Sequence, residues 1–241
     1  MTGPDPATSG PSNLALRIAS SAVMAPITIF IAWLGGWPFV LFWTLAACVV
    51  LWEWTMLVRG ANPEPTEARF AAWMLVGLVY AGILLLGPVA LRRDAEFGFA
   101  AILFLFAVVW TTDIAAYFTG RALGGPKLWP AVSPKKTWSG AIGGMVGAVA
   151  AGLFVLTLMG LAVGPMLVLV AAALSAISQG GDLIESSIKR HFGAKDASHL
   201  IPGHGGLMDR LDGFLTAVLA AVMVGLLRGG LEGPARGLIV W

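Results

Sequence analysis

Residues 137–181 read TWSGAIGGMVGAVAAGLFVLTLMGLAVGPMLVLVAAALSAISQGG, a run of 45 residues without any Asp, Glu, Lys or Arg. A transmembrane helix needs about 20 mostly apolar residues, so this run is long enough for two. Gly160 to Pro165 lie near its middle, and Gly and Pro interrupt helices. The run therefore predicts two membrane-spanning helices, near residues 139–160 and 165–190.

Other charge-free runs of bilayer length occur along the chain. They lie between Arg17 and Glu53, Arg69 and Arg92, Glu96 and Asp113, and Asp212 and Arg228. The first holds 35 residues and is divided by the turn GGWP at 35–38. We therefore expect five further spans, near residues 16–34, 38–58, 70–91, 97–118 and 207–228. Runs this long without alternation predict helices rather than barrel strands. The expected fold class is all-α, a polytopic integral membrane helix bundle of about seven transmembrane helices.

The composition of the 241-residue chain agrees with this fold class. Hydrophobic residues make up 58%, charged residues 12%, and the mean hydropathy is +0.84. A soluble domain carries about twice that charged fraction, so soluble, disordered and disulfide-stapled classes are excluded. The net charge of +2 gives no reason to expect a nucleic-acid partner. Cys48 is the single cysteine and cannot form an intrachain disulfide.

The spans divide the chain into four parts. We expect a flexible N-terminal tail at 1–13, N-terminal transmembrane helices at 14–108, catalytic transmembrane helices with polar loops at 109–230, and a C-terminal tail at 231–241. With seven spans, 11 Lys and Arg residues fall on one side of the membrane and 4 on the other. The positive-inside rule places the richer side in the cytoplasm. The expected location is therefore the inner (plasma) membrane. The polar loops of 109–230, where we expect the active site, would face the cytoplasm.

The segment from Asp182 to Asp212 carries much of the polar chemistry. It contains nine of the 28 charged residues and all three histidines. Because a charge at mid-bilayer costs roughly 2.5–3.5 kcal/mol, the segment must lie at the interface or line a wet cavity. Its length and polar density predict a function rather than a plain connection.

Two parts of this segment are suited to phosphate chemistry. Helical spacing places four polar side chains on one helix face: Ser178, Asp182, Ser186 and Lys189. Downstream, the turn GHGG at 203–206 precedes an apolar helix, and a glycine turn at a helix N-terminus offers free backbone N–H groups to a phosphate. The alternative is that the glycines form only a turn.

Three carboxylates point to a metal ion. Asp209 and Asp212 are three residues apart in the first turn of a predicted helix, and Asp182 lies on the preceding helix. Mg²⁺ prefers a few carboxylates together with water and phosphate oxygens. We therefore expect these three residues to hold Mg²⁺. Acidic residues in a first helical turn can also merely complement the helix dipole.

A second polar block runs from Trp110 to Gly140. Asp113 lies four residues before Tyr117, so both share a helix face. Gly-Pro and Ser-Pro steps predict a structured turn after that helix. The block contains four basic residues, Arg121, Lys127, Lys135 and Lys136. The adjacent lysines could bind a polyphosphate or could form only a basic cytoplasmic edge.

Other features have structural interpretations. A stripe of small residues four apart predicts close helix packing: Gly140, Gly144, Ala148 and Gly152. Tryptophans near the span ends, among them Trp33 and Trp54, are expected to anchor the interface. Glu53, beside Trp54, is interpreted first as an interfacial residue and second as a site residue.

Several of these runs resemble the phosphatidate cytidylyltransferases, also called CDP-diglyceride synthases. The longest begins with SSIKR at 186–190, continues with KD at 195–196 and ends with PGHGGLMDRLD at 202–212. DIAAY at 113–117, SPKKTW at 133–138, SQGGDL at 178–183 and EW at 53–54 are also similar to that family. Two positions depart from it: Ser139-Gly140 stands where the family usually has Glu-Gly, and Ala197-Ser198 where it usually has Ser-Gly.

The resemblance implies that CMP is transferred from CTP to phosphatidic acid, which gives CDP-diacylglycerol and pyrophosphate, with Mg²⁺ as cofactor. The catalytic residues would be Asp182, Lys189, Arg190, Asp209 and Asp212. The substrate-binding residues would be Asp113, Tyr117, Arg121, Lys135, Lys136, Ser186, Lys195, Asp196, His204, Gly205, Gly206 and Arg210.

Three alternatives stay open from the sequence. A transporter could use the same charges as an ion path, although no internal repeat of the kind common in transporters is present. A related CTP-dependent transferase could act on another lipid phosphate or on a polyprenol. The oligomeric state is open too, with a homodimer as one alternative.

Overall fold

The structure is a computed structural model that describes residues 13–241 apart from 62, 199 and 202–204. The expected flexible tail at 1–13 therefore lies outside the described residues except for Asn13. The predicted site residue His204 also lies outside them. Eight helices are described: α1 (Asn13–Leu34), α2 (Gly36–Arg59), α3 (Glu67–Arg92), α4 (Gly98–Leu123), α5 (Trp138–Leu158), α6 (Pro165–His191), α7 (Met208–Gly229) and α8 (Pro234–Ile239).

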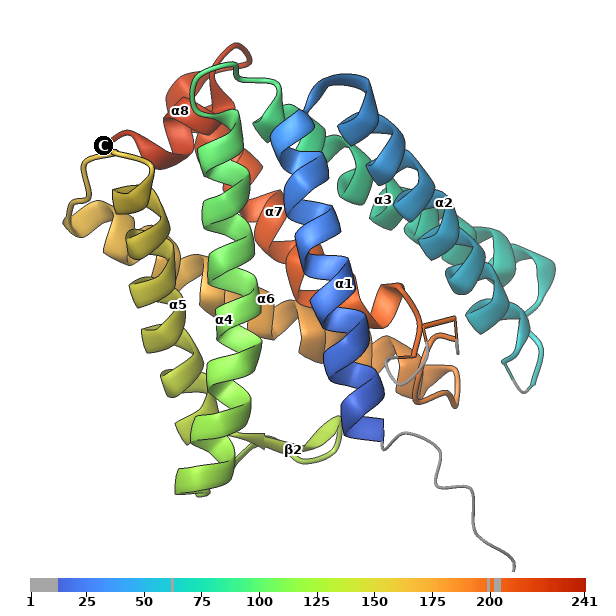
Figure 1. Cartoon of the computed structure of the whole chain (residues 1–241). Helices are drawn as coiled ribbons and strands as arrows, with labels where there is room; N and C mark the ends of the chain where they lie inside the picture. Colours follow the sequence, from blue (N-terminus) through green and yellow to red (C-terminus); the bar gives the residue numbers. More distant parts are fainter. Residues whose placement is uncertain (1–12, 62, 199, 202–204) are drawn as a thin grey trace, which may run out of the picture.

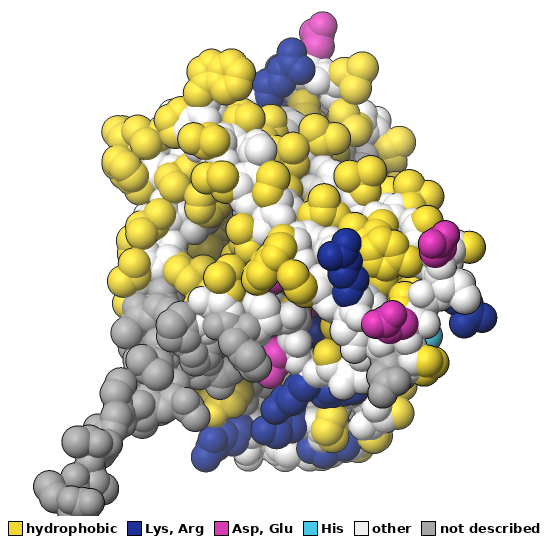
Figure 2. Space-filling model, turned by 90° about the vertical axis from the view of Figure 1, so that its right-hand side faces the viewer, with side chains coloured by type: hydrophobic (Ala, Val, Ile, Leu, Met, Phe, Trp, Pro, Cys, Tyr) yellow, Lys and Arg dark blue, Asp and Glu magenta, His cyan; other side chains and the backbone are white. Residues whose placement is uncertain are grey.

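The predicted multi-pass helix bundle is confirmed. Six helices, α2 to α7, are long and apolar enough to cross a membrane. Within α1, the apolar stretch Ala22–Leu34 is shorter than a membrane span, so the count of seven spans stays a prediction. Figure 2 shows hydrophobic side chains over most of one face, with Lys and Arg gathered at its lower end.

Glycine and proline set the helix boundaries where the sequence predicts them. Gly35 has φ 62°, a conformation that costs glycine little, and it separates α1 from α2. Gly160, with φ 74°, follows the end of α5, and Pro165 is the first residue of α6. Proline suits this position because its missing N–H would have no helical partner there.

The small-residue stripe packs α5 closely against α4, as predicted. Gly140, Gly144, Ala148 and Gly152 are all buried. A Cβ atom at Gly144 would lie 2.8 Å from the Thr112 carbonyl oxygen of α4, which is too close for any larger residue. The two helices lie side by side along the bundle (Figure 1).

Aromatic side chains fill the core between the other helices. The Trp43 ring of α2 stacks on Phe214 of α7, with centroids 5.1 Å apart. Trp54 is fully buried and donates from Nε1 to the Trp73 carbonyl oxygen at 2.9 Å. Trp54 therefore joins α2 to α3, and the prediction that it anchors the interface is wrong, whereas Trp33 is exposed as expected.

Two additions to the predicted helices mark opposite ends of the bundle (Figure 1). The structured turn expected after α4 is an antiparallel hairpin of β1 (Lys127–Trp129) and β2 (Ser133–Thr137). The region expected as a C-terminal tail contains α8, which packs against α7 and has Leu238 and Ile239 buried. The hairpin end of the bundle is the end at which the two polar blocks of the sequence meet.

Candidate active site

A polar cleft of about 750 Å³ lies where the hairpin, α4, α6 and α7 meet. Its lining contains five carboxylates and six cationic side chains: Asp113, Arg121, Lys127, Lys135, Lys136, Asp182, Lys189, Asp196, Asp209, Arg210 and Asp212. Tyr117, Thr137 and Gln179 add neutral polar groups. The two polar blocks of the sequence therefore form a single cleft.

Eleven of the predicted site residues line this cleft and five described ones do not. The five are Ser186, Arg190, Lys195, Gly205 and Gly206. Ser186 lies next to the cleft, since its hydroxyl donates to Asp182 Oδ1 at 3.3 Å. Arg190 is exposed and donates to the Ala194 carbonyl oxygen at 3.0 Å, which ties down the end of α6.

An ion pair joins the hairpin to α6 inside the cleft. Lys136 of β2 donates to Asp182 Oδ2, and both side chains are about one quarter exposed, at 27% and 24%. Asp113 and Asp212 line the same cleft, so three carboxyl groups that would repel one another when ionised lie together there. Lys136 and Arg210 bring positive charge to the same cleft.

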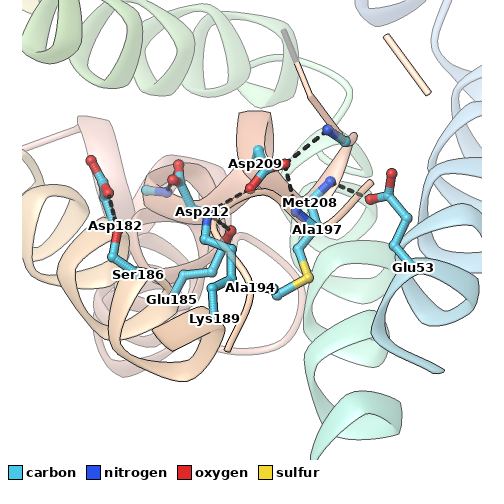
Figure 3. Close-up of polar contacts among 12 residues, drawn as sticks. Glu53, Asp182, Glu185, Ser186, Lys189, Ala194, Ala197, Met208, Asp209 and Asp212 are labelled. Atoms are coloured by element: carbon cyan, nitrogen blue, oxygen red, sulfur yellow. Dashed lines mark hydrogen bonds and ion pairs between the residues drawn. The ribbon is translucent and has the colours of Figure 1, made fainter. Parts of the chain in front are cut away.

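Asp209 belongs to a buried chain of polar groups that connects three helices. Lys189 Nζ of α6 lies 2.5 Å from Asp209 Oδ1 and 3.0 Å from Glu185 Oε1. The Tyr80 hydroxyl of α3 donates to Glu185 Oε2 at 2.9 Å. Figure 3 shows Lys189 reaching up toward Asp209 at the start of α7. Lys189 is thus fixed between two carboxylates.

The second oxygen of Asp209 binds the loop that precedes α7. Asp209 Oδ2 accepts from the backbone N–H of Ala197 at 2.9 Å and of Gly206 at 2.8 Å. Both carboxylate oxygens therefore have protein donors, and the residue is only 8% exposed. A buried charge is stable when it is paired and hydrogen-bonded in this way.

The Gly206 N–H of the glycine turn and the first two N–H groups after it are not free, contrary to the expectation from the sequence; Gly203 and His204 lie outside the described residues. Gly206 donates to Asp209, and the N–H groups of Leu207 and Met208 donate to Glu53 at 2.9 and 2.7 Å. Glu53 is completely buried, so its interpretation as first an interfacial residue is wrong. Figure 3 shows its carboxylate reaching from α2 toward Met208.

The glycines of this turn make room for these internal carboxylates. A Cβ atom at Gly206 would lie 2.6 Å from Glu53 Oε1, and one at Gly205 would lie 2.8 Å from Asp209 Oδ2. Gly205 also has φ 83°, where other residues are strained. Close approach by Glu53 and Asp209 is therefore a sufficient reason for glycine at both positions.

The donors in the cleft fit a Mg²⁺ ion only in part. Among the residues that the structure describes, no three His, Cys, Asp or Glu side chains converge as a ready-made metal site. Asp209 accepts from three protein donors and Asp182 from two, Ser186 and Lys136, so both use both oxygens, whereas Asp212 accepts from the Gly213 N–H at one oxygen. This set suits an ion that enters with phosphate oxygens, since Mg²⁺ commonly takes one or two carboxylates plus phosphates.

The two departures from the family pattern have local roles. Ser139 donates to the Gly124 carbonyl oxygen, which ties the start of α5 to the end of α4. Thr137 caps α5 by accepting from the Gly140 N–H at 3.1 Å. In the second departure, Ala197 supplies its N–H to Asp209, and the Ser198 hydroxyl donates to Glu53 Oε1 at 2.5 Å.

A second hollow, of about 350 Å³, lies between α3 and α7. Its lining is entirely aliphatic or glycine: Val79, Gly82, Ile83, Leu86, Gly87, Ala90, Leu219 and Val222. It offers no donor or charge to a phosphate. The polar cleft is therefore the candidate active site.

Comparison with known proteins gives a family match over more than half of the chain. The sequence model of the cytidylyltransferase family matches residues 64–227, which include every charged residue of the cleft. A phosphatidate cytidylyltransferase of Brucella suis biovar 1 is 42% identical over 253 residues, covering 89% of this chain and 94% of that protein. Another, of Staphylococcus haemolyticus, is 43% identical over 146 residues, covering 60% of this chain and 55% of that protein.

Proposed function

The chain belongs to the cytidylyltransferase family, and from this we propose that it transfers CMP from CTP to phosphatidic acid, giving CDP-diacylglycerol and pyrophosphate. The observation that carries the proposal is the polar cleft at one end of an apolar multi-pass bundle. Such a cleft lets a lipid phosphate remain near the membrane surface while a water-soluble nucleotide enters from outside the bilayer.

In the proposed reaction, an oxygen of the phosphatidate phosphate attacks the α-phosphorus of CTP. A new P–O bond forms as the bond to the β-phosphate bridging oxygen breaks, and pyrophosphate leaves with that electron pair. Such phosphoryl chemistry depends on positioning and charge neutralisation more than on a covalent nucleophile. The attacking phosphate is already ionised, so the reaction needs no strong general base.

The cationic side chains of the cleft are suited to neutralise the phosphates. Arg121, Lys127 and Lys135 are exposed at the α4 and hairpin side, and Arg210 of α7 lines the same cleft. We assign Lys189 a positioning role, because it is already held by Asp209 and Glu185. Arginine and lysine in a cleft bind phosphate through charge-assisted hydrogen bonds.

We propose that Asp182 and Asp212 hold a Mg²⁺ ion together with oxygens of the triphosphate. Bound there, the ion would stabilise negative charge that develops on the phosphates. Asp209, the third residue of the expected set, would contribute by fixing the loop before α7, because its oxygens accept from Lys189, Ala197 and Gly206.

The distribution of basic residues supports a cleft that faces the cytoplasm. The hairpin end carries Lys127, Lys135 and Lys136, whereas the opposite end has arginines at 92, 93, 228 and 236. Positively charged loops are retained in the cytoplasm, where CTP is available. We therefore propose the inner membrane of the cell as the location.

The test is a substrate assay with purified protein in lipid nanodiscs. Radiolabelled CTP and phosphatidate should give CDP-diacylglycerol and an equal amount of pyrophosphate, and EDTA should stop the reaction. A polyprenyl phosphate and a polyprenol serve as competing acceptors. Product from either of these but not from phosphatidate would overturn the proposed acceptor. Turnover that continues in EDTA would overturn the proposed requirement for Mg²⁺.

A further inference from the structure

We propose that Glu53, assisted by Ser198, is a positioning residue that fixes the first turn of α7 for the reaction; this rests on the proposed function. Glu53 lies on α2, in the N-terminal part of the chain and outside residues 64–227 matched by the family model. Its carboxylate nevertheless binds the loop that carries the cleft residues.

The contacts of Glu53 all come from one short region of the distant sequence. Oε1 accepts from the Ser198 hydroxyl at 2.5 Å and from the Leu207 N–H at 2.9 Å, and Oε2 accepts from the Met208 N–H at 2.7 Å. No described Lys or Arg side chain forms an ion pair with Glu53. Backbone N–H groups and the hydroxyl therefore stabilise its negative charge.

A carboxylate is the appropriate group at this place. The first N–H groups of a helix lack partners within the helix, and its N-terminus carries a partial positive charge. The residue at the N-cap of α7 is Leu207, whose side chain cannot accept a hydrogen bond. Glu53 thus caps α7 from another helix, and it does so without exposure to solvent.

The capped turn is also the turn that presents side chains to the cleft. Asp209, Arg210 and Asp212 all line the cleft from the first residues of α7. Asp209 holds the same loop from the other side through the Gly206 N–H. Glu53 and Asp209 together fix where Arg210 and Asp212 stand relative to Asp182 on α6.

Ser198 adds a side-chain hydrogen bond to Glu53 that the usual family residue at this position, glycine, could not make. It is the second residue of Ala197-Ser198, where the family usually has Ser-Gly. The Ser198 hydroxyl donates to Glu53 and accepts from the Leu200 N–H at 3.2 Å. The hydroxyl therefore links the loop after α6 to the same carboxylate that caps α7.

The experiment compares Glu53→Gln, Ser198→Ala and the double variant with the wild-type protein. Glu53→Gln keeps the shape but replaces one acceptor oxygen by a donor amide. We expect kcat to fall about tenfold or more while the KM for phosphatidate stays within about threefold. Ser198→Ala should lower kcat about threefold, and should lower it no further in the Glu53→Gln background. Glu67→Gln, at an exposed position of α3, is the matched control.

Two readouts separate positioning from simple loss of folding. Thermal unfolding of each variant in detergent gives the folded fraction, and hydrogen–deuterium exchange at residues 205–212 reports the capped N–H groups. Faster exchange there in Glu53→Gln, with unchanged exchange in α5, supports the proposal. An unchanged kcat in Glu53→Gln, a kcat loss that equals the unfolded fraction, or equal Ser198→Ala losses in both backgrounds would overturn it.

The exchange measurement also keeps this proposal distinct from the proposed function. If the wild-type protein failed to use phosphatidate, the function would fail, yet faster exchange in Glu53→Gln would still establish the cap. If Glu53→Gln could not be purified, Ser198→Ala would replace it, and exchange at residues 205–212 equal to wild type would overturn the proposal.

Discussion

Asp182 is the carboxylate of the cleft whose role can be tested with the least disturbance. Asp182→Asn keeps the shape and removes the charge that faces the proposed metal and phosphates. We expect kcat for CDP-diacylglycerol formation to fall about 100-fold. The melting temperature should change little, because a partly exposed ion pair such as Lys136–Asp182 contributes about 0–1 kcal/mol.

The measurement is a Mg²⁺ titration of initial rates, with melting temperature recorded in the same detergent. Glu232→Gln is the control, since Glu232 is exposed near α8 at the other end of the bundle. Full turnover by Asp182→Asn with an unchanged Mg²⁺ requirement would show that this carboxylate does not hold the ion.

Loss of Lys189 should lower the free energy of unfolding more than loss of the Tyr80 hydroxyl does. Lys189→Met leaves two buried carboxylates, Glu185 and Asp209, without their cation, which costs about 3–5 kcal/mol. Tyr80→Phe removes a single hydrogen bond to Glu185 and should cost about 1–3 kcal/mol. Chemical unfolding in detergent measures both. Equal stability of Lys189→Met and the wild-type protein would contradict this ranking.

At the residue scale, the sequence predicted most of the cleft and misassigned its supports. Asp113, Lys136 and Asp182 could be singled out because charge near apolar helices is rare and therefore informative, whereas Arg210 was implied by the family resemblance. Tyr80 lies within an apolar run, and its hydroxyl was the one available signal. Partners such as Glu185 depend on helix packing, which spacing along a single helix does not reveal.

The contact between α4 and α5 supports a prediction at the scale of elements. In Gly144→Ala, the added methyl would press on the Thr112 carbonyl oxygen of α4. Overpacking of this kind costs about 1–3 kcal/mol, and it should also displace the hairpin that joins the two helices. Gly82→Ala is the control, because a Cβ atom there meets nothing within 4 Å.

Thermal unfolding and turnover should report this displacement together. We expect Gly144→Ala to lower both the melting temperature and kcat, and Gly82→Ala to leave both near the wild-type values. A Gly144→Ala protein as stable as Gly82→Ala would mean that the helices can separate at no cost.

Helix boundaries could be predicted within a few residues, whereas the short elements could not. Gly35, Gly160 and Pro165 break apolar runs, and such breaks are strong signals. The hairpin has strands of three and five residues, too short for an alternating pattern to be detected. The six residues of α8 give no helical period either.

At the scale of the molecule, the order of the helices in space could not be derived from the sequence. Every span is apolar on most sides, so hydropathy shows that the helices lie in lipid but does not show which helices pack against one another. The bonds from Glu53 to Leu207 and Met208 join residues 154 and 155 positions apart. They show that the N-terminal helices support the site as well as anchoring the chain.

The orientation of the bundle is the last prediction, and it concerns the whole molecule. The hairpin end is rich in lysine, and positively charged loops stay in the cytoplasm, so the α8 end should face outward. Two single-cysteine variants made with Cys48→Ser test this: Ala131→Cys at the exposed hairpin tip and Leu231→Cys, where the native side chain is 84% exposed. A membrane-impermeant maleimide should label Leu231→Cys in intact spheroplasts, and should label Ala131→Cys only after the membrane is opened. Labelling of Ala131→Cys alone in intact spheroplasts would reverse the orientation and would place the cleft on the side that lacks CTP.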